Sequence, residues 1–147
     1  IPKRDWSSDV CSSDLKEAAM NMIGQGADVL YHVANQAGTG VITAAQEKGL
    51  LACGNSYDQN SIAPETVMCS TVYNMPKVIT TAVGQVEKGE FKGGVYYLAM
   101  AEGVVDIAGY NSFEDKVPQE LKDKVAAKKQ AIVDGSFTVP RIETPTK

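Results

Sequence analysis

Short apolar runs of strand length alternate with amphipathic segments along most of this chain. The runs ADVLYHV (27–33), LLACG (50–54) and VMCSTVY (67–73) are nearly continuous in apolar residues, as expected of strands that are covered on both faces. Helical patterns separate or follow them. Strands and helices in this order are typical of an α/β fold with a largely parallel sheet, so we expect that fold class.

The segments between and after these runs carry helix start and stop signals. We predict the end of a helix over 16–26 with Gly26 as its cap, a short helix from GTG (38–40) that stops at Gly49, and a helix that Asn74 can cap. Helical spacing predicts buried stripes on this third helix and on a last helix over 117–135. The stripes comprise Met75, Val78, Ile79, Ala82, Val83 and Val86, and Val117, Leu121, Val125 and Ile132.

The remaining apolar runs predict further strands. GVYYLAM (94–100) and VVDIAGY (104–110) are separated by AEG, and we expect them to form an antiparallel pair. The ending FTVPRIETPTK (137–147) predicts a short strand and a loose tail.

The first 15 residues do not follow the alternation. DWSSDVCSSDL (5–15) has neither helical nor strand periodicity, and by composition alone it would be a Ser/Asp linker with a lone thiol. It also resembles the translation of a common short-read sequencing adapter, and Ile1–Arg4 fit the index bases before that adapter. We therefore interpret residues 1–15 as a non-native, adapter-derived segment and exclude them from the fold reasoning.

Charge and cysteine usage narrow the classes of function. The net charge is −4 and no basic cluster is present, so we expect no nucleic-acid partner. Cys53 and Cys69 lie in strand runs without metal-ligand spacing, which favours buried free thiols over a disulfide or a metal site. His32, the only histidine, is predicted as a packed strand residue rather than a catalytic base.

Polar segments follow the three predicted strands, and open α/β sheets bind ligands beyond the carboxyl ends of their strands. In ANQAGTG (34–40), backbone N–H groups at a helix start can receive an anion or a sugar hydroxyl, or can simply form a turn. In NSYDQ (55–59), Tyr57 can stack on a flat ligand while its polar neighbours orient it. The candidate ligand-binding residues are Asn35, Gln36, Gly38, Thr39, Ser56, Tyr57, Asp58, Gln59, Tyr73 and Asn74.

The ordered set of motifs resembles a known family across about residues 16–140. GQGADVLYHVANQAGTGVITAAQEKGL, CGNSYDQNSIAPETV, STVYNMPKVITTAVGQVEKGEF and KVPQELKDKVAAKKQAIVDGSFTVP follow each other as in the basic membrane protein family of PnrA-like solute-binding lipoproteins. The resemblance implies an incomplete type 1 periplasmic-binding-protein fold, mostly its second lobe, so that residues 16–147 would be the C-terminal part of a solute-binding domain. It implies no catalytic residues, metal or cofactor.

The same resemblance implies a function and a location. Such proteins deliver a small molecule to an ABC transporter permease from the periplasm or the cell surface, and characterised relatives bind purine nucleosides. We expect their only membrane contact, a lipid anchor, to lie in a missing N-terminal part. One lobe without its partner cannot enclose a ligand, so we expect this polypeptide alone to bind poorly or not at all and its parent protein to bind.

Carried over residue by residue, the family pattern is only partly kept. Asp58 and Gln59 match the family's Asp-Gln pair, and Gly38 and Gly40 match its helix-start glycines. Ser56 stands where nucleoside binders have a ligand-contacting Asp, and Tyr73 stands where they have Lys. These differences remove charge-assisted hydrogen bonds to a ligand. We therefore expect either a purine nucleoside or a flat ligand that is less polar or carries different substituents.

Two other classes of function remain open at this point. One is an α/β enzyme acting on a nucleoside or sugar phosphate at the same strand ends, for which only His32 and Asp58 offer a catalytic group. The other is a sensor or regulator that reuses the binding fold.

Overall fold

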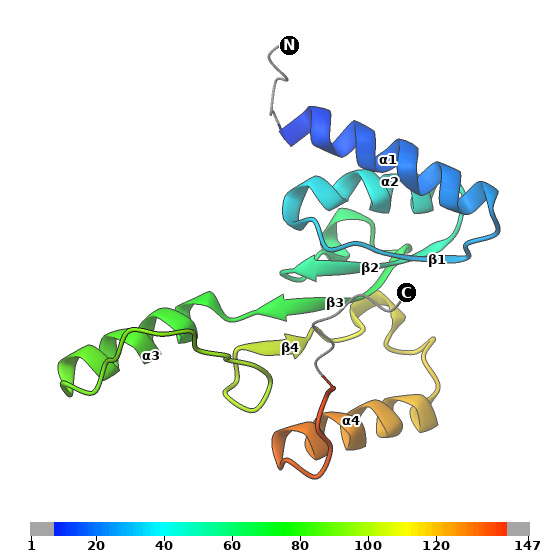
Figure 1. Cartoon of the computed structure of the whole chain (residues 1–147). Coiled ribbons are helices and arrows are strands. Elements are labelled where there is room, and N and C mark those ends of the chain that lie inside the picture. The colour runs from blue at the N-terminus through cyan, green and yellow to red at the C-terminus, as the bar shows by residue number, and fades with distance from the viewer. Residues whose placement is uncertain (1–7, 141–147) are drawn as a thin grey trace, which may run out of the picture. The chain divides into compact units, whose positions relative to one another are not determined.

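The computed structural model describes residues 8–140 and contains helices and strands in alternation (Figure 1). The chain divides into two compact units, each described by itself below: the first runs to Tyr73 and includes Asp106–Val117, and the second contains Asn74–Val105 and resumes at Pro118. The helices and strands are α1 (Ser8–Gly24), β1 (Val29–Tyr31), α2 (Thr39–Glu47), β2 (Leu51–Ser56), β3 (Val67–Tyr73), α3 (Met75–Glu87), β4 (Val105–Ile107) and α4 (Gln119–Val133). The predicted α/β class is confirmed.

The sheet has the strand order β1-β2-β3-β4. β1 pairs with β2 in parallel, with Tyr31 opposite Cys53, and β2 pairs with β3 in parallel, with Asn55 opposite Thr71. The register shifts between Ala52 and Cys53, which is a bulge near the start of the β2–β3 ladder. The three parallel carboxyl ends therefore meet at one edge of the sheet.

The fourth strand pairs differently from the prediction. Asn74 N–H donates to the Val104 carbonyl and Ala108 N–H donates to the Ser70 carbonyl, both at 2.8 Å, so β4 runs antiparallel beside β3. The predicted strand over 94–100 is wrong. Its backbone enters a turn instead, because the carbonyl of Ala99 accepts from Val104 N–H and the amide of Ala99 donates to the Glu102 carboxylate.

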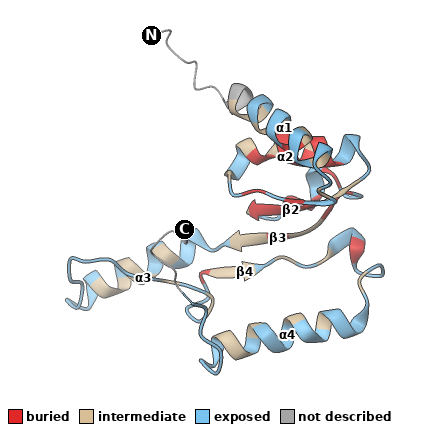
Figure 2. Cartoon of the chain, turned by 45° about the vertical axis from the view of Figure 1, so that its right-hand side comes forward, coloured by how far each residue is buried: buried red, intermediate tan, exposed pale blue. Residues whose placement is uncertain are grey.

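The hydrophobic core of the first unit lies between α1, α2 and the parallel strands (Figure 2). Gly40 lies where the two helices cross: a Cβ on this residue would come within 1.9 Å of the Ser12 carbonyl oxygen, so a larger residue would push α1 away. The buried apolar residues of this core are Ala19, Leu30, Val41, Ile42, Ala44, Ala45, Ala52, Ala63 and Val67.

Helix α1 begins earlier than the sequence pattern indicates. It starts at Ser8, inside the stretch that shows no periodicity, because no Pro or Gly interrupts residues 8–23 and Leu15 packs against the core. Residues 1–7 lie outside the described range, and the adapter origin of 1–15 stays a hypothesis. Residues 141–147 of the predicted tail also lie outside that range, and the structure has no strand over 137–140.

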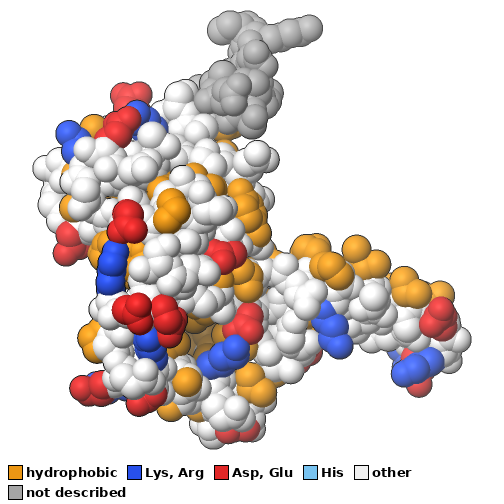
Figure 3. Space-filling view, turned by 180° about the vertical axis from the view of Figure 1, so that it is seen from behind, with side chains coloured by type: hydrophobic (Ala, Val, Ile, Leu, Met, Phe, Trp, Pro, Cys, Tyr) orange, Lys and Arg blue, Asp and Glu red, His pale blue; other side chains and the backbone are white. Residues whose placement is uncertain are grey.

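The two helices of the second unit are confirmed, but their predicted buried stripes are wrong. Neither α3 nor α4 has a buried residue, and Leu121 is half exposed. On α3, Val78 and Ala82 line a small hollow with Phe91 and Leu98 from the segment that follows the helix. An apolar row remains uncovered along α3 (Figure 3), and it consists of Met75, Ile79, Val83 and Val86.

Candidate functional site

The β2 strand ends in a backbone conformation that is unusual for its residue. Ser56 has φ = +77° and Asn35, after β1, has φ = +48°. Non-glycine residues rarely adopt this left-handed region, and they concentrate at functional sites when they do. The Ser56 hydroxyl contacts Oδ1 of Asn35, and Oδ1 of Asn55 lies 3.0 Å away on its other side. The side chains after β1 and β2 are thus brought together as predicted.

The buried Gln59 side chain and backbone link the segment after β1 to strands β2 and β3. Its Oε1 accepts from the backbone N–H of Asn55 at 3.0 Å and lies 2.9 Å from Nε2 of His32, while its Nε2 donates to the Asn35 carbonyl at 3.3 Å. Its backbone N–H donates to Oγ of Ser70 on β3 at 3.1 Å. Because the Gln59 side chain is fully buried and bonded at both ends, it positions its neighbours and offers no surface to a ligand.

His32 is a packed residue, as predicted. Oε1 of Gln59 has no proton to give, so Nε2 of His32 donates the bond and Nδ1 is left unprotonated. Nδ1 has no partner among the described residues and faces Gly38, where an added Cβ would come within 1.9 Å of it. Burial lowers the pKa of His32 below its ordinary value of 6.5, and the bond to Gln59 opposes this shift only in part.

The sheet face opposite α1 and α2 carries a row of polar side chains that joins the candidate Tyr73 to three residues outside the candidate set, Asn55, Thr71 and Tyr31. Nδ2 of Asn55 donates to Oγ1 of Thr71 at 2.9 Å and to the hydroxyl of Tyr73 at 3.1 Å. The hydroxyl of Tyr31 lies 3.1 Å from the same Thr71 oxygen. Tyr31 and Thr71 were missed because their role depends on strand register, although alternation along each strand could have put them on one face with Asn55.

Two candidate tyrosines have exposed rings, Tyr73 at the end of this row and Tyr57 in the loop after β2. Tyr57 is 45% exposed and Tyr73 is 39% exposed, so each ring retains an open area for contact. Asp58 is fixed by an Asx turn to Asn60 N–H at 3.0 Å and accepts from Nδ2 of Asn111 at 2.9 Å. Asn111, a further residue that sequence reasoning missed, comes from the turn at Asn111–Phe113, which the chain brings back to the first unit.

The glycine segment after β1 forms a turn rather than an open anion cradle. Asn35–Gly38 is a 3₁₀ turn that leads directly into α2. The N–H of Gly38 donates to the Ala34 carbonyl and the N–H of Thr39 is bonded to carbonyls of the turn. The Thr39 hydroxyl lies 3.2 Å from the Ser12 hydroxyl of α1. Of this group, Asn35 and Gln36 are exposed.

Asn74 belongs to the second unit and serves a local role there. Its Oδ1 accepts from the backbone N–H of Lys77 at 3.1 Å, which is the predicted cap of α3.

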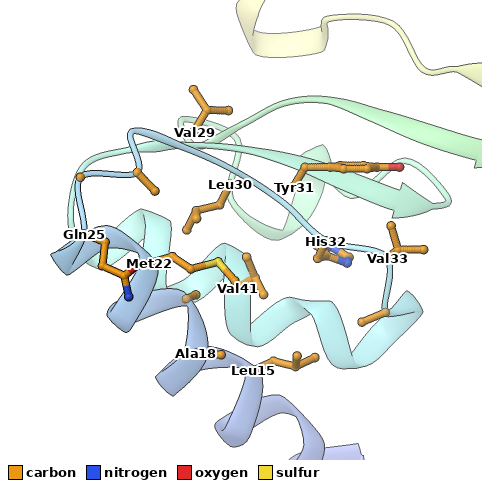
Figure 4. Close-up of a pocket in the computed structure, with 14 residues that line it drawn as sticks. Leu15, Ala18, Met22, Gln25, Val29, Leu30, Tyr31, His32, Val33 and Val41 are labelled. Carbon is orange, nitrogen blue, oxygen red and sulfur yellow. The ribbon is translucent and has the colours of Figure 1, made fainter. Parts of the chain in front are cut away.

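A cavity of about 660 Å³ lies beside the free edge of β1, and its lining includes Tyr31 and His32 (Figure 4). The rest of the lining is mostly apolar side chains of α1 and β1, among them Met22 and Leu30, together with Val41 of α2. Leu30 points from the strand toward the helices and Val29 points the opposite way. Since β1 is the edge strand, this hollow follows an open sheet edge, and most of the side chains around it are apolar.

A comparison with models of known protein families identifies the family of this chain. The family model described as "ABC transporter substrate-binding protein PnrA-like" matches residues 12–143, nearly the whole chain. The chain belongs to the PnrA-like family. The match begins at Ser12, within the stretch interpreted above as adapter-derived, and continues through every strand end of the candidate site.

Individual PnrA-like relatives agree with this assignment. The transcriptional activator protein Med of Bacillus subtilis is 31% identical over 121 residues, which are 82% of this chain and 36% of Med. The ABC transporter nucleoside-binding protein BmpA of Lactococcus lactis is 29% identical over 143 residues, covering 85% of this chain and 39% of that protein. The chain thus spans little more than a third of the length of these relatives.

A solved structure supports the same fold. The crystal structure of an ABC transporter system solute-binding protein from Aeropyrum pernix K1 superposes with a TM-score of 0.71 at 21% identity, over 90% of this chain and 46% of that one. The PnrA-like chain therefore has part of the solute-binding-protein fold, as the sequence predicted. None of the helices within residues 8–140 is long and apolar enough to cross a membrane.

Proposed function

We propose that the strand ends of the first unit bind a small, flat, polar ligand such as a purine nucleoside or a related compound. One observation carries the proposal: the open rings of Tyr57 and Tyr73 flank side chains that the buried Gln59 network holds in place. A flat ring can stack on tyrosine, while fixed amide and hydroxyl groups select its edge. Rigid placement of these groups before binding lowers the entropic cost of association.

The charges around this surface indicate what kind of ligand it accepts. Asp58 is the only ionisable carboxylate among the candidate residues, and it is already engaged by Asn60 and Asn111. The remaining polar groups are hydroxyls and amides, which recognise uncharged hydrogen-bonding ligands. A free phosphate would meet no cation among the candidate residues, so a nucleoside fits better than a nucleotide.

In the intact protein this binding would serve transport. We propose that the chain is part of an extracytoplasmic solute-binding component that hands its ligand to an ABC transporter permease. Its support is the PnrA-like family match together with the nucleoside-binding name of the Lactococcus lactis relative. We propose attachment at the periplasmic or cell-surface side through a lipid anchor.

The test is a titration of the isotopically labelled 147-residue chain with adenosine, guanosine and inosine, followed by amide NMR. We expect saturable shifts confined to residues 55–59, 71–73 and the turn at 35–38, and no saturable shifts with the matching 5′-monophosphates. Tyr57→Ala should weaken binding about tenfold, since stacking on an aromatic ring is worth about 1–3 kcal/mol. Tyr97→Ala, at a 67% exposed tyrosine of the second unit, is the matched control. Saturable shifts outside these segments, or equal effects of both substitutions, would contradict the proposal.

A second candidate is a ligand-sensing regulator, favoured by the similarity to Med, a transcriptional activator by name. It would use the same surface to bind a small molecule, so the titration does not separate it from a transport receptor. Growth of a deletion strain on the bound solute as sole purine source separates the two. Loss of uptake without a transcriptional change supports the receptor, and the reverse supports the regulator.

The enzyme alternative has little support from the residues that it would need. His32 is buried with its Nε2 bonded to Gln59, and both oxygens of Asp58 are engaged. The unpaired Nδ1 of His32 is buried against Gly38, away from a bound substrate, and the Asp58 carboxylate would have to leave its present hydrogen bonds to take a proton.

A further inference from the structure

Two cysteines of the first unit lie side by side on neighbouring strands. Cys53 of β2 and Cys69 of β3 are register partners in the parallel ladder, and their Sγ atoms are 3.6 Å apart. Both are free thiols, as the sequence predicts, but they are partly rather than completely buried. The third cysteine, Cys11, lies in α1.

Their geometry suits a covalent bond. Neighbouring strands lie about 4.8 Å apart, within the Cα separation of about 4.4–6.8 Å that disulfides span. Because the two residues are directly paired, their side chains leave the sheet on the same face, as the contact between the sulfur atoms also requires. Closing from 3.6 Å to a bonded distance of about 2.05 Å needs only side-chain rotation and a small strand adjustment.

The contact also makes one thiol more reactive than the other. Either thiol can donate across this contact, and the hydrogen bond lowers the pKa of Cys69 to about 7 and raises the pKa of Cys53. A large share of Cys69 is then thiolate at neutral pH, and the thiolate is the form that attacks a disulfide. The partial exposure of both residues leaves room for a small oxidant.

We propose that Cys53 and Cys69 are a redox-modification site, at which exchange with a small-molecule or protein disulfide forms an intramolecular cross-strand disulfide. The Cys69 thiolate attacks the oxidant's S–S bond, forms a mixed disulfide and releases one oxidant thiolate. Cys53 then loses its proton to solvent and its sulfur attacks Cys69, releasing the second oxidant thiolate. The protein loses two electrons and two protons, and the oxidant is reduced to two thiols.

The bond would act on the candidate site through the backbone. Cys53 and Cys69 each lie two residues before a member of the polar row, Asn55 and Thr71 respectively, on the same strands and the same face. A covalent link there fixes the register of β2 against β3 where the ladder is irregular, between Ala52 and Cys53. The inference does not depend on the proposed ligand, because the thiol geometry stands without it.

Mass spectrometry of the whole 147-residue chain tests the site directly. The reduced protein is incubated with oxidised glutathione at dilute concentration, alkylated with iodoacetamide and cleaved with trypsin. Trypsin leaves Cys53 and Cys69 in one peptide, residues 49–77, and leaves Cys11 in another, residues 5–16. We expect the 49–77 peptide to lose two hydrogens and escape alkylation, and further cleavage after Glu65 to leave its halves joined. The thiol count should fall from three to one, and the melting midpoint should rise by several degrees.

Matched cysteine variants show whether the internal link joins Cys53 to Cys69. C11S should form the same internal link, whereas C53S and C69S should not. The link should form faster in the native protein than in urea, because the unfolded chain does not hold the sulfurs together. Full alkylation of Cys53 and Cys69 after oxidation would overturn the proposal. Stable glutathione adducts, disulfide-linked dimers, or equal rates in the native and urea-unfolded chain would overturn it as well.

Discussion

Nε2 of His32 lies 2.9 Å from Oε1 of Gln59, and both side chains are buried beneath the strand ends. The pair joins the segment after β1 to the loop after β2, and Gln59 N–H extends the connection to Ser70 on β3. This bracket of His32 and Gln59 therefore connects the two segments that carry Asn35, Gln36, Tyr57 and Asp58. Its strength should be visible in the stability of the chain.

Acid should weaken the fold through His32. Burial lowers the pKa of this residue in the folded state, so the unfolded chain binds the proton more readily. The stabilising contribution of the neutral ring is thus present above about pH 6.5 and is lost as the pH falls through the folded pKa. Urea unfolding between about pH 6.5 and 5 should show a slope of at most about 1.4 kcal/mol per pH unit.

The variant His32→Gln supplies the control, because His32 is the only histidine in the chain. It should flatten the acid slope in this window. Cys69 has a pKa of about 7, so its titration affects the stability mainly above this pH window. An unchanged slope in His32→Gln would assign the acid sensitivity to another group.

Replacing Gln59 should be costly because its partners are buried. Gln59→Leu removes the acceptor for Asn55 N–H and His32 Nε2 and the donor to Asn35. Each buried polar group left unpaired costs about 1–3 kcal/mol, so we expect a loss of about 3 kcal/mol in the free energy of unfolding. Gln46→Leu on the exposed face of α2 should change it by under about 0.5 kcal/mol. Equal losses in the two variants would show that the bracket carries no special stability.

One substitution should have opposite effects at two glycines. A Cβ at Gly54 would lie 2.4 Å from Oγ of Ser70 and 2.7 Å from Oε1 of Gln59, so Gly54→Ala should destabilise by about 2 kcal/mol through overpacking. Gly84 lies inside α3 with nothing within 4 Å, so Gly84→Ala should stabilise by about 0.5–1 kcal/mol. Thermal unfolding measures both, and a neutral Gly54→Ala would contradict the packing described.

The sequence predicts best those helices and strands whose ends are marked by neighbouring residues. β3 was predicted with the observed ends, because a mostly apolar run leads into Asn74, which caps the next helix. The start of α1 could not be predicted, since Ser8–Asp14 become helical without any apolar periodicity of their own. Residues 94–100 have strand composition, but the turn at 99–104 consumes the hydrogen bonds that a ladder would need.

The site shows the same division. Polar residues at the carboxyl ends of parallel strands meet for topological reasons, so the segments at Asn35 and Ser56 were predictable. Which loop side chains turn inward was not, because no local pattern sets the path of the loop after β2. Gln59 therefore became internal support rather than ligand surface, and Tyr31 meets Thr71 across β2 only once the strand order is known.

The contact between Tyr31 and Thr71 can be tested by a double-mutant cycle. The hydroxyls lie 3.1 Å apart across the sheet face that carries the candidate site, and Thr71 also accepts from Asn55. Tyr31→Phe should cost about 0.5–1 kcal/mol, and Thr71→Val should cost more because it also leaves the Asn55 amide without one acceptor. The double variant should cost less than the sum of the two, with a coupling of about 0.5–1 kcal/mol in urea unfolding. A coupling below about 0.3 kcal/mol would mean that the two hydroxyls act independently and that β1 does not hold this row together.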